Sequence, residues 1–278
     1  SYLERSRTEI AAIQDPFLES RVLSSISSVL LSQGELAAAR SRAEEALALG
    51  RKIGNRNAEG RALHNLAAVL VWEGKLNEAS RLAERSYGFL KDGDPIEAGS
   101  ALAVWADATA RLGDLPGARR HLEEALALKQ KANDRIAVAR LRGSLAKLQL
   151  LEGDLAAARK TSAGELRTAR GIGSRPLLAW SLQVEAAVLN RSDSMPGSRR
   201  SLEAALAASE STGETLRTML IRGDLARALL SLGDNVRAAD LAETVSTWCR
   251  ERGNSWCEAD AKATEANALA SEGRKPEA

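Results

Sequence analysis

The chain has 278 residues, of which 44% are hydrophobic and only 3% aromatic, with 39 basic and 37 acidic side chains. This near balance gives no reason to expect a nucleic-acid or membrane surface. Two cysteines are too few for a disulfide framework and favour a reducing compartment. No apolar run approaches the roughly 20 residues of a membrane span, so we expect a cytoplasmic protein without a membrane partner.

Glycines divide the chain at a period of about 40 residues. The first series follows apolar segments and comprises Gly34, Gly74, Gly113, Gly153, Gly233 and Gly273, with its missing member at Asp193. The second series lies about half a period later and comprises Gly54, Gly93, Gly173, Gly213 and Gly253, with its missing member at Asn133. Asparagine is the residue that best replaces glycine in a left-handed helix-terminating conformation. Two turns per period predict a repeat of two helices.

The segments between the turns carry apolar residues at helical spacing. We name the helix before each first-series turn the A helix and the one after it the B helix. The A helices are predicted at 18–33, 56–73, 96–112, 135–152, 176–191, 215–232 and 255–272. The B helices are predicted at 1–13, 36–52, 76–91, 115–131, 155–171, 195–212 and 235–252. We therefore expect an all-α fold without strands, in one array over residues 1–278 of about six and a half repeats.

Prolines and capping residues agree with these helix starts. Pro116, Pro196 and Pro276 follow the first-series turns by three residues, and Pro16, Pro95 and Pro176 precede A helices. Asp114, Asp154, Ser194 and Asp234 follow the same turns by one residue. An N-cap residue with a proline in the first turn is typical of a helix start. The segment from Arg274 is expected to be too short to form a helix.

Small residues occupy two fixed positions in every repeat. Seven residues before each turn stand Ser27, Ala67, Ala106, Ala146, Ala186, Ala226 and Ala266. Five residues after it stand Ala39, Ala79, Ala118, Ala158, Ser198, Ala238 and Ala278. With the turn pattern and the segment Leu63–Ala67, this resembles tetratricopeptide repeats of the long-repeat type found in kinesin light chains, Pins-type scaffolds and bacterial signalling proteins. The resemblance implies a right-handed superhelical α-solenoid of antiparallel helix pairs.

Both ends of the chain cut through a repeat. Solenoids normally end in capping repeats, so we expect a piece of a longer protein whose cut ends could associate with another molecule.

Catalytic and cofactor motifs are missing from the sequence: we find no phosphate-binding loop, no H-E-x-x-H, no G-x-S-x-G and no C-x-x-C. His64 and His121 stand on different repeats, which does not favour a metal or catalytic site. We therefore expect no enzyme, no cofactor and no metal. Cys249 and Cys257 flank one turn and are expected to be free thiols beside a packing site, with a disulfide as the alternative.

The resemblance also implies that the A helices line a concave surface. Positions 13, 10, 9, 6 and 2 before each turn are left outside the core stripe and should face this groove. The predicted partner-binding residues are Arg21, Arg61, His64, Asn65, Trp72, Asp107, Arg140, Lys147, Trp180, Gln183, Asp224 and Arg227. Their basic excess predicts an acidic or carboxylate-bearing partner. Asn65 matches the asparagine with which the family holds a peptide backbone.

Two glycines inside A helices, Gly143 and Gly223, stand ten residues before their turns in matching sequence frames. Glycine inside a helix costs about 1 kcal/mol relative to alanine. The two glycines make room for a ligand or a neighbouring helix, or they are the product of a duplication of two repeats.

We expect a protein–protein interaction scaffold that holds a peptide or partner segment in its groove, within a larger bacterial signalling or regulatory protein. The alternative is an effector-sensing module of a transcription regulator or kinase, which an apolar pocket in the groove would favour. Nucleic acid is not expected as a partner, because the basic residues are dispersed and lack interleaved aromatic residues for stacking.

Overall fold

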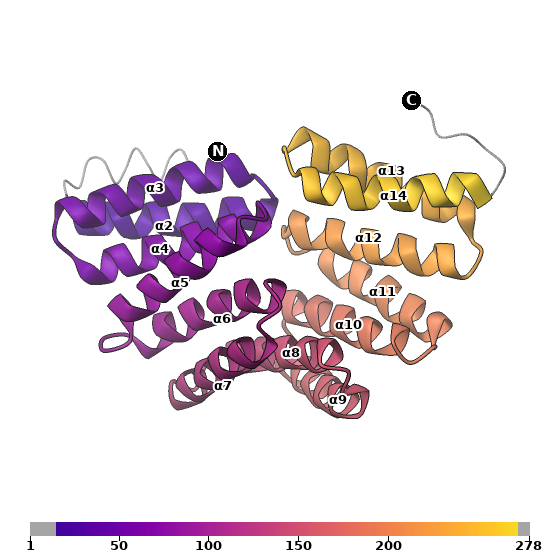
Figure 1. Ribbon diagram of the computed structural model, residues 1–278, viewed down its shortest axis with the longest axis horizontal. Coiled ribbons are helices and arrows are strands. Elements are labelled where there is room, and N and C mark those ends of the chain that lie inside the picture. The colour runs from indigo at the N-terminus through magenta and orange to yellow at the C-terminus, as the bar shows by residue number, and fades with distance from the viewer. Residues whose placement is uncertain (1–14, 272–278) are drawn as a thin grey trace. The chain divides into compact units, whose positions relative to one another are not determined.

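The computed structural model describes residues 15–271, and every regular element in that range is an α-helix (Figure 1). In chain order the helices are α2 (Pro16–Gln33), α3 (Leu36–Lys52), α4 (Arg56–Trp72), α5 (Leu76–Leu90), α6 (Pro95–Arg111), α7 (Leu115–Lys131), α8 (Arg135–Leu151), α9 (Leu155–Ile172), α10 (Arg175–Asn190), α11 (Met195–Ser209), α12 (Thr215–Ser231), α13 (Asn235–Glu251) and α14 (Ser255–Ser271). The all-α prediction is confirmed, and the even-numbered helices are the predicted A helices. The B helix predicted at 1–13 and the segment from Arg274 lie outside the described residues.

The predicted turn residues adopt the left-handed backbone conformation at nearly every site. Nine of the glycines have positive φ, and the two residues predicted to replace glycine do so too, with φ of 55° at Asn133 and 54° at Asp193. Gly93 is the exception, because its φ lies outside the left-handed range. At that turn the backbone N–H groups of Gly93 and Asp94 both donate to the carbonyl of Leu90, which closes the helix without a left-handed residue.

Helix starts follow the predicted capping pattern in part. The side chains of Asp114 and Asp154 accept hydrogen bonds from the backbone N–H groups of Gly117 and Ala157, at 2.9 Å each. Ser194 and Asp234 occupy the same N-cap position but make no such side-chain bond. The described prolines lie in the first turns of α2, α6, α7, α10 and α11, where a missing N–H breaks no helical bond.

The small residues of the two predicted series lie where A and B helices of one repeat touch. Ala67 and Ala79 are fully buried, and the other described members are buried too, except for the partly exposed Ala266. Where serine replaces alanine, its hydroxyl bonds across this contact: Ser27 Oγ donates to the Ala39 carbonyl at 2.8 Å. Ser198 Oγ donates to the Ala186 carbonyl at 3.0 Å. Small side chains thus allow the backbones to approach closely.

The helices group into two compact units, residues 1–135 with α2–α7 and residues 136–278 with α8–α14. Unit 1 has a leucine and alanine core that includes Leu63, Leu66 and Leu70 of α4. The core of unit 2 includes Leu225 and Leu229 of α12. That these units form one array stays a prediction.

Cys249 of α13 and Cys257 of α14 form a disulfide, so the expectation of two free thiols was wrong. The antiparallel turn between the two helices brings these residues to a Cα–Cα distance of 5.8 Å, which is within the usual range for a disulfide. None of the described helices has the length and apolar character needed to cross a membrane.

Candidate binding site

Unit 1 contains a polar pocket on the side of its A helices, with a volume of about 210 Å³. Its lining comes from three consecutive A helices, with Arg21, Ser24, Ser25 and Ser28 from α2, Arg61, His64 and Asn65 from α4, and Glu97 from α6. The predicted groove residues of the first two repeats, Arg21, Arg61, His64 and Asn65, therefore lie together around one cavity. The helical phase that places them is the one predicted from the sequence.

Several polar atoms of this pocket lack hydrogen-bond partners among the described residues. They are Ser24 Oγ, Arg61 Nε and His64 Nδ1, and all three atoms are buried. Ser24 is only 5% exposed. Arg61 has a loose ion pair with Glu97, at 3.8 Å between Nη1 and Oε1. Buried polar groups are normally hydrogen-bonded, so unsatisfied groups around one cavity are suited to a polar ligand.

His64 is uncharged at neutral pH, because burial and the nearby Lys129 lower its pKa to about 4. It therefore adds no positive charge to the pocket and offers one ring N–H and one acceptor nitrogen. The positive charge of the pocket rests on Arg21 and Arg61, opposed by Glu97 alone among the lining residues.

Asn65 is 7% exposed and is held by α2. Its Nδ2 donates to the Ser24 carbonyl at 2.7 Å, and its Oδ1 accepts from Ser28 Oγ at 3.1 Å. The expectation that Asn65 lies outside the core is therefore wrong. Its amide links two A helices and orients Ser24 and Ser28, which leaves a single N–H and a single lone pair for a ligand.

The other predicted residues of unit 1, Trp72 and Asp107, form a second cluster around Arg111. The guanidinium carbon of Arg111 lies 5.3 Å from the Trp72 ring centroid, and its Nε lies 3.2 Å from Asp107 Oδ1. These contacts join the ends of α4 and α6. They do not line the polar pocket.

Trp180 of α10 is at the centre of the predicted residues in unit 2. Lys147 Nζ of α8 lies 4.4 Å from its ring centroid, and the guanidinium of Arg217 of α12 lies 4.7 Å from it. Such distances are typical of cation–π contacts. Glu214 pairs with Arg217 at 3.4 Å and with Arg140 at 3.8 Å. Burial lowers the pKa of Arg217 to about 10, and the neighbouring charge of Arg140 adds to this effect.

Gln183 joins this cluster to the next A helices. Its Nε2 donates to Asp224 Oδ2 at 2.7 Å, and its Oε1 accepts from Arg217 at 3.2 Å. Arg227 pairs with Asp224 and with Asp260 of α14. All six predicted residues of unit 2 thus belong to one polar network, whose charges are largely paired with one another.

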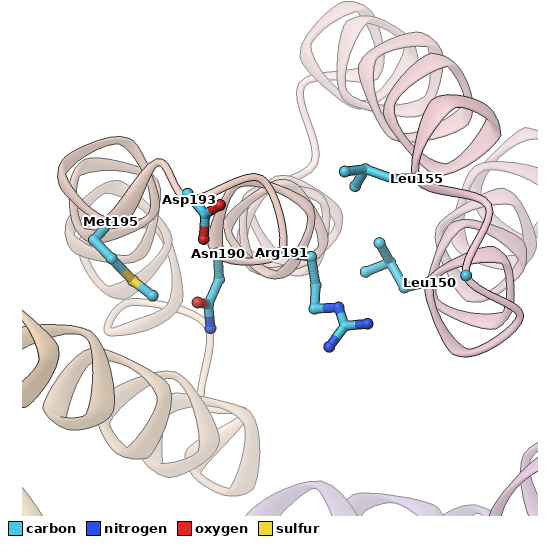
Figure 2. A pocket seen from close by; sticks show the side chains of 7 residues that line it. Leu150, Leu155, Asn190, Arg191, Asp193 and Met195 are labelled. Atoms are coloured by element: carbon cyan, nitrogen blue, oxygen red, sulfur yellow. The ribbon is translucent and has the colours of Figure 1, made fainter.

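Unit 2 also has a hollow of about 410 Å³ beside two A–B turns. Figure 2 shows the side chains of Leu150 and Leu155 on one side of it and Arg191 on another. Asn190, Asp193 and Met195 complete its side-chain lining. The hollow lies at the turns and does not include any of the predicted partner-binding residues, although Arg191 holds one of the positions that were predicted to face the groove.

The structure contains residues of the site that the sequence interpretation missed. Ser24 holds the same position before its turn as His64, so the repeat phase could have identified it. Arg217 and Glu214 lie outside the chosen positions and enter the site only through contacts between repeats. Within residues 15–271 there is no group of three or more His, Cys, Asp or Glu side chains that could hold a metal ion. His121 stacks on Trp105, with ring centroids 3.9 Å apart.

Comparison with known proteins agrees with this architecture. Residues 18–92 match the tetratricopeptide repeat family. This part of the chain carries tetratricopeptide repeats. No curated protein sequence matches it at a significant level.

Three crystal structures share the arrangement of consecutive antiparallel helix pairs with this chain. A STAND signal transduction ATPase with a tetratricopeptide repeat sensor, from Pyrococcus horikoshii, has 16% identity and a TM-score of 0.64 over 97% of this chain and 42% of its own. Aspartyl phosphate phosphatase F from Bacillus subtilis has 13% identity and a TM-score of 0.60, over 95% and 74%. BtubC from P. vanneervenii has 17% identity and a TM-score of 0.55, over 87% and 94%. At these identities the likeness shows the fold alone, and this chain spans less than half of the STAND protein.

Proposed function

We propose that this protein is an interaction scaffold that binds a peptide or a segment of a partner protein along the A-helix side of its repeats. The observation that carries the proposal is the polar pocket of unit 1, where the predicted residues Arg21, Arg61, His64 and Asn65 meet. Tetratricopeptide repeats generally serve protein interaction, which supports the same reading. The chain acts by binding and not by catalysis.

The bound segment is acidic. Arg21 and Arg61 provide two guanidinium groups, and the buried Ser24 Oγ and Arg61 Nε provide donors without partners. A carboxylate can accept from several of these donors at once, and charge-assisted hydrogen bonds are the stronger kind. Glu97 faces the same pocket, so the partner's carboxylate competes with it for Arg61.

A small-molecule effector module is the alternative function. An apolar pocket would favour this alternative. The pocket of unit 1 is instead lined by charged, hydroxyl, amide and imidazole groups. We therefore favour a peptide partner. The likeness to a STAND signal transduction protein with a repeat sensor and to a phosphatase of Bacillus subtilis supports a place within a larger signalling or regulatory protein, and the phosphatase supports a bacterial one.

The proposal is tested with fluorescein-labelled oligoglutamate, oligoglutamine and oligolysine peptides in fluorescence anisotropy titrations. The protein should bind oligoglutamate, with an affinity that falls as salt rises. Arg21→Ala with Arg61→Ala should weaken binding more than tenfold, since charge-assisted contacts contribute about 1.5–3 kcal/mol each.

The matched control is Arg81→Ala with Arg120→Ala, which removes the same charge from exposed positions on the B helices of unit 1. If both double variants weaken binding equally, attraction is general and the pocket is not the site. If oligoglutamate binds no better than oligoglutamine, the partner is not acidic.

A further inference from the structure

Gly143 of α8 and Gly223 of α12 hold the same place in two A helices of unit 2. Their frames, Arg142–Lys147 and Arg222–Arg227, share the arginine before the glycine, the Leu-Ala pair and the final basic residue. Glycine inside a helix destabilises it relative to alanine. We therefore looked at the neighbouring side chains for a contact that requires glycine at these two positions.

The surroundings of Gly143 supply that reason. A Cβ atom added to it would lie 2.5 Å from Trp180 Nε1 and 3.3 Å from Val184 Cγ2, both on the next A helix. The absent side chain leaves a slot that the edge of the Trp180 indole fills. Lys147, one helical turn after the glycine, places its Nζ 4.4 Å from the centroid of the same ring.

Gly223 has no such neighbour. A Cβ atom added there would meet no atom within 4 Å. The residue two repeats after Trp180 is Asp260, which pairs with Arg227 and does not cover the glycine. Arg227 in turn holds the position of Lys147. We call this open space beside Gly223 the Gly223 slot. Like the slot at Gly143, it has a helix glycine and a cationic side chain, but no aromatic ring fills it.

We propose that the Gly223 slot receives an aromatic side chain of the bound partner, in the place that Trp180 takes over Gly143. The ring packs against the bare backbone of α12, and the Arg227 guanidinium contacts its face as Lys147 contacts Trp180. The ion pair with Arg227 holds the Asp260 carboxylate beside the guanidinium. An indole N–H or phenol O–H of the ring can therefore donate to this carboxylate. The slot therefore prefers tryptophan or tyrosine to phenylalanine. This inference rests on the proposed function and assigns a second recognition element to the same partner.

The test uses N-acetyltryptophanamide as the probe, with N-acetylphenylalaninamide and N-acetylalaninamide for comparison. Binding is followed by NMR through the backbone amide of Gly223. The tryptophan probe should shift this amide and bind more tightly than the phenylalanine probe, and the alanine probe should have no effect. Gly223→Ala fills the slot from below and should weaken binding about tenfold or more. Asp260→Trp introduces an indole at the position that corresponds to Trp180. This internal indole should occupy the slot and abolish binding of the probe.

Gly164→Ala on the B helix α9 is the matched control, because Gly164 also lies inside a helix of unit 2 and a Cβ atom there would meet only Arg167 Nη2, at an ordinary contact distance of 3.8 Å. It should leave probe binding unchanged. The inference is overturned if the probe does not shift Gly223, or if Gly223→Ala and Asp260→Trp bind it as the wild type does. In either case the glycine is a remnant of duplication. Oligoglutamate binding at Arg21 and Arg61 is measured separately, so the failure of one idea is distinguishable from the failure of the other.

Discussion

Glu165 on α9 and Ser181 on α10 are both fully buried in unit 2 and are hydrogen-bonded to each other. The Ser181 hydroxyl donates to Glu165 Oε1 and also lies 2.7 Å from the Leu177 carbonyl, so two acceptors compete for its single proton. A carboxylate at Glu165 therefore has to share the serine proton with the Leu177 carbonyl. The corresponding position in the other described B helices holds Ala46, Ser86, Ala125, Ala205 and Val245, so Glu165 is the one ionisable residue at this position among them.

The stability of unit 2 should fall as Glu165 ionises. Burial raises its pKa to about 7, although the Ser181 hydrogen bond acts in the opposite direction. A group whose pKa is raised on folding contributes its full stabilisation below its unfolded pKa, about 4.3, and loses it as the pH rises through about 7. The loss is on the order of 1–3 kcal/mol.

Urea unfolding between pH 5 and pH 8 measures this loss. Glu165→Gln should reduce the pH dependence and be more stable than wild type at pH 8. The exposed Glu84→Gln should keep the wild-type profile. A wild-type stability that stays constant over this range would contradict the assignment.

Asn65→Ala should destabilise the protein as well as affect the pocket. The change removes the bonds to the Ser24 carbonyl and from Ser28 Oγ, and it leaves a buried carbonyl without that donor. The expected loss in the free energy of unfolding is about 1–3 kcal/mol. Asn57→Ala, at an exposed position of the same helix, should stay within about 0.5 kcal/mol of wild type. Equal stability of the two variants would show that the Asn65 amide does not hold α2 and α4 together.

Asp193→Gly should stabilise the turn between α10 and α11. Asp193 has a φ of 54° where most other turns hold glycine, and a side chain makes that conformation costly. Relief of this cost is partly offset by the greater freedom of glycine in the unfolded chain. We therefore expect the free energy of unfolding, measured by thermal unfolding, to rise by about 0.5–1 kcal/mol. Asp193→Ala keeps a Cβ and serves as the counterpart, and it should not gain stability. A loss of stability in Asp193→Gly would mean that the aspartate side chain itself supports the turn.

The Cys249–Cys257 disulfide predicts that the protein isolated without reductant contains no free thiol. Since the chain has only these two cysteines, thiol titration in denaturant gives a direct answer. Reduction should lower the free energy of unfolding by about 2–3 kcal/mol, because the bond closes a short loop in the unfolded chain. The variant Cys249→Ala with Cys257→Ala should be insensitive to reductant. Two titratable thiols in the untreated protein would contradict the bond.

The repeat architecture was predictable because its signals are local. A left-handed turn depends on the conformational freedom of one residue, as at Asn133 and Asp193, and a helix start depends on a cap such as Asp114. The helical phase is local too, and it correctly predicted that Arg21 and Arg61 lie on the same side of their helices, where both line one pocket. Local signals repeated every 40 residues reinforce one another, which is why the helix positions followed from the sequence alone.

Relationships between repeats were decided only by the tertiary structure. Gly143 is explained by Trp180 on the following A helix, and Asn65 turns inward because Ser24 and Ser28 of the preceding one meet its amide. Repeat phase predicts which face of a helix a residue occupies. It does not predict which side chain of the next repeat will reach that residue, because this depends on helix spacing and rotamers throughout the packed unit.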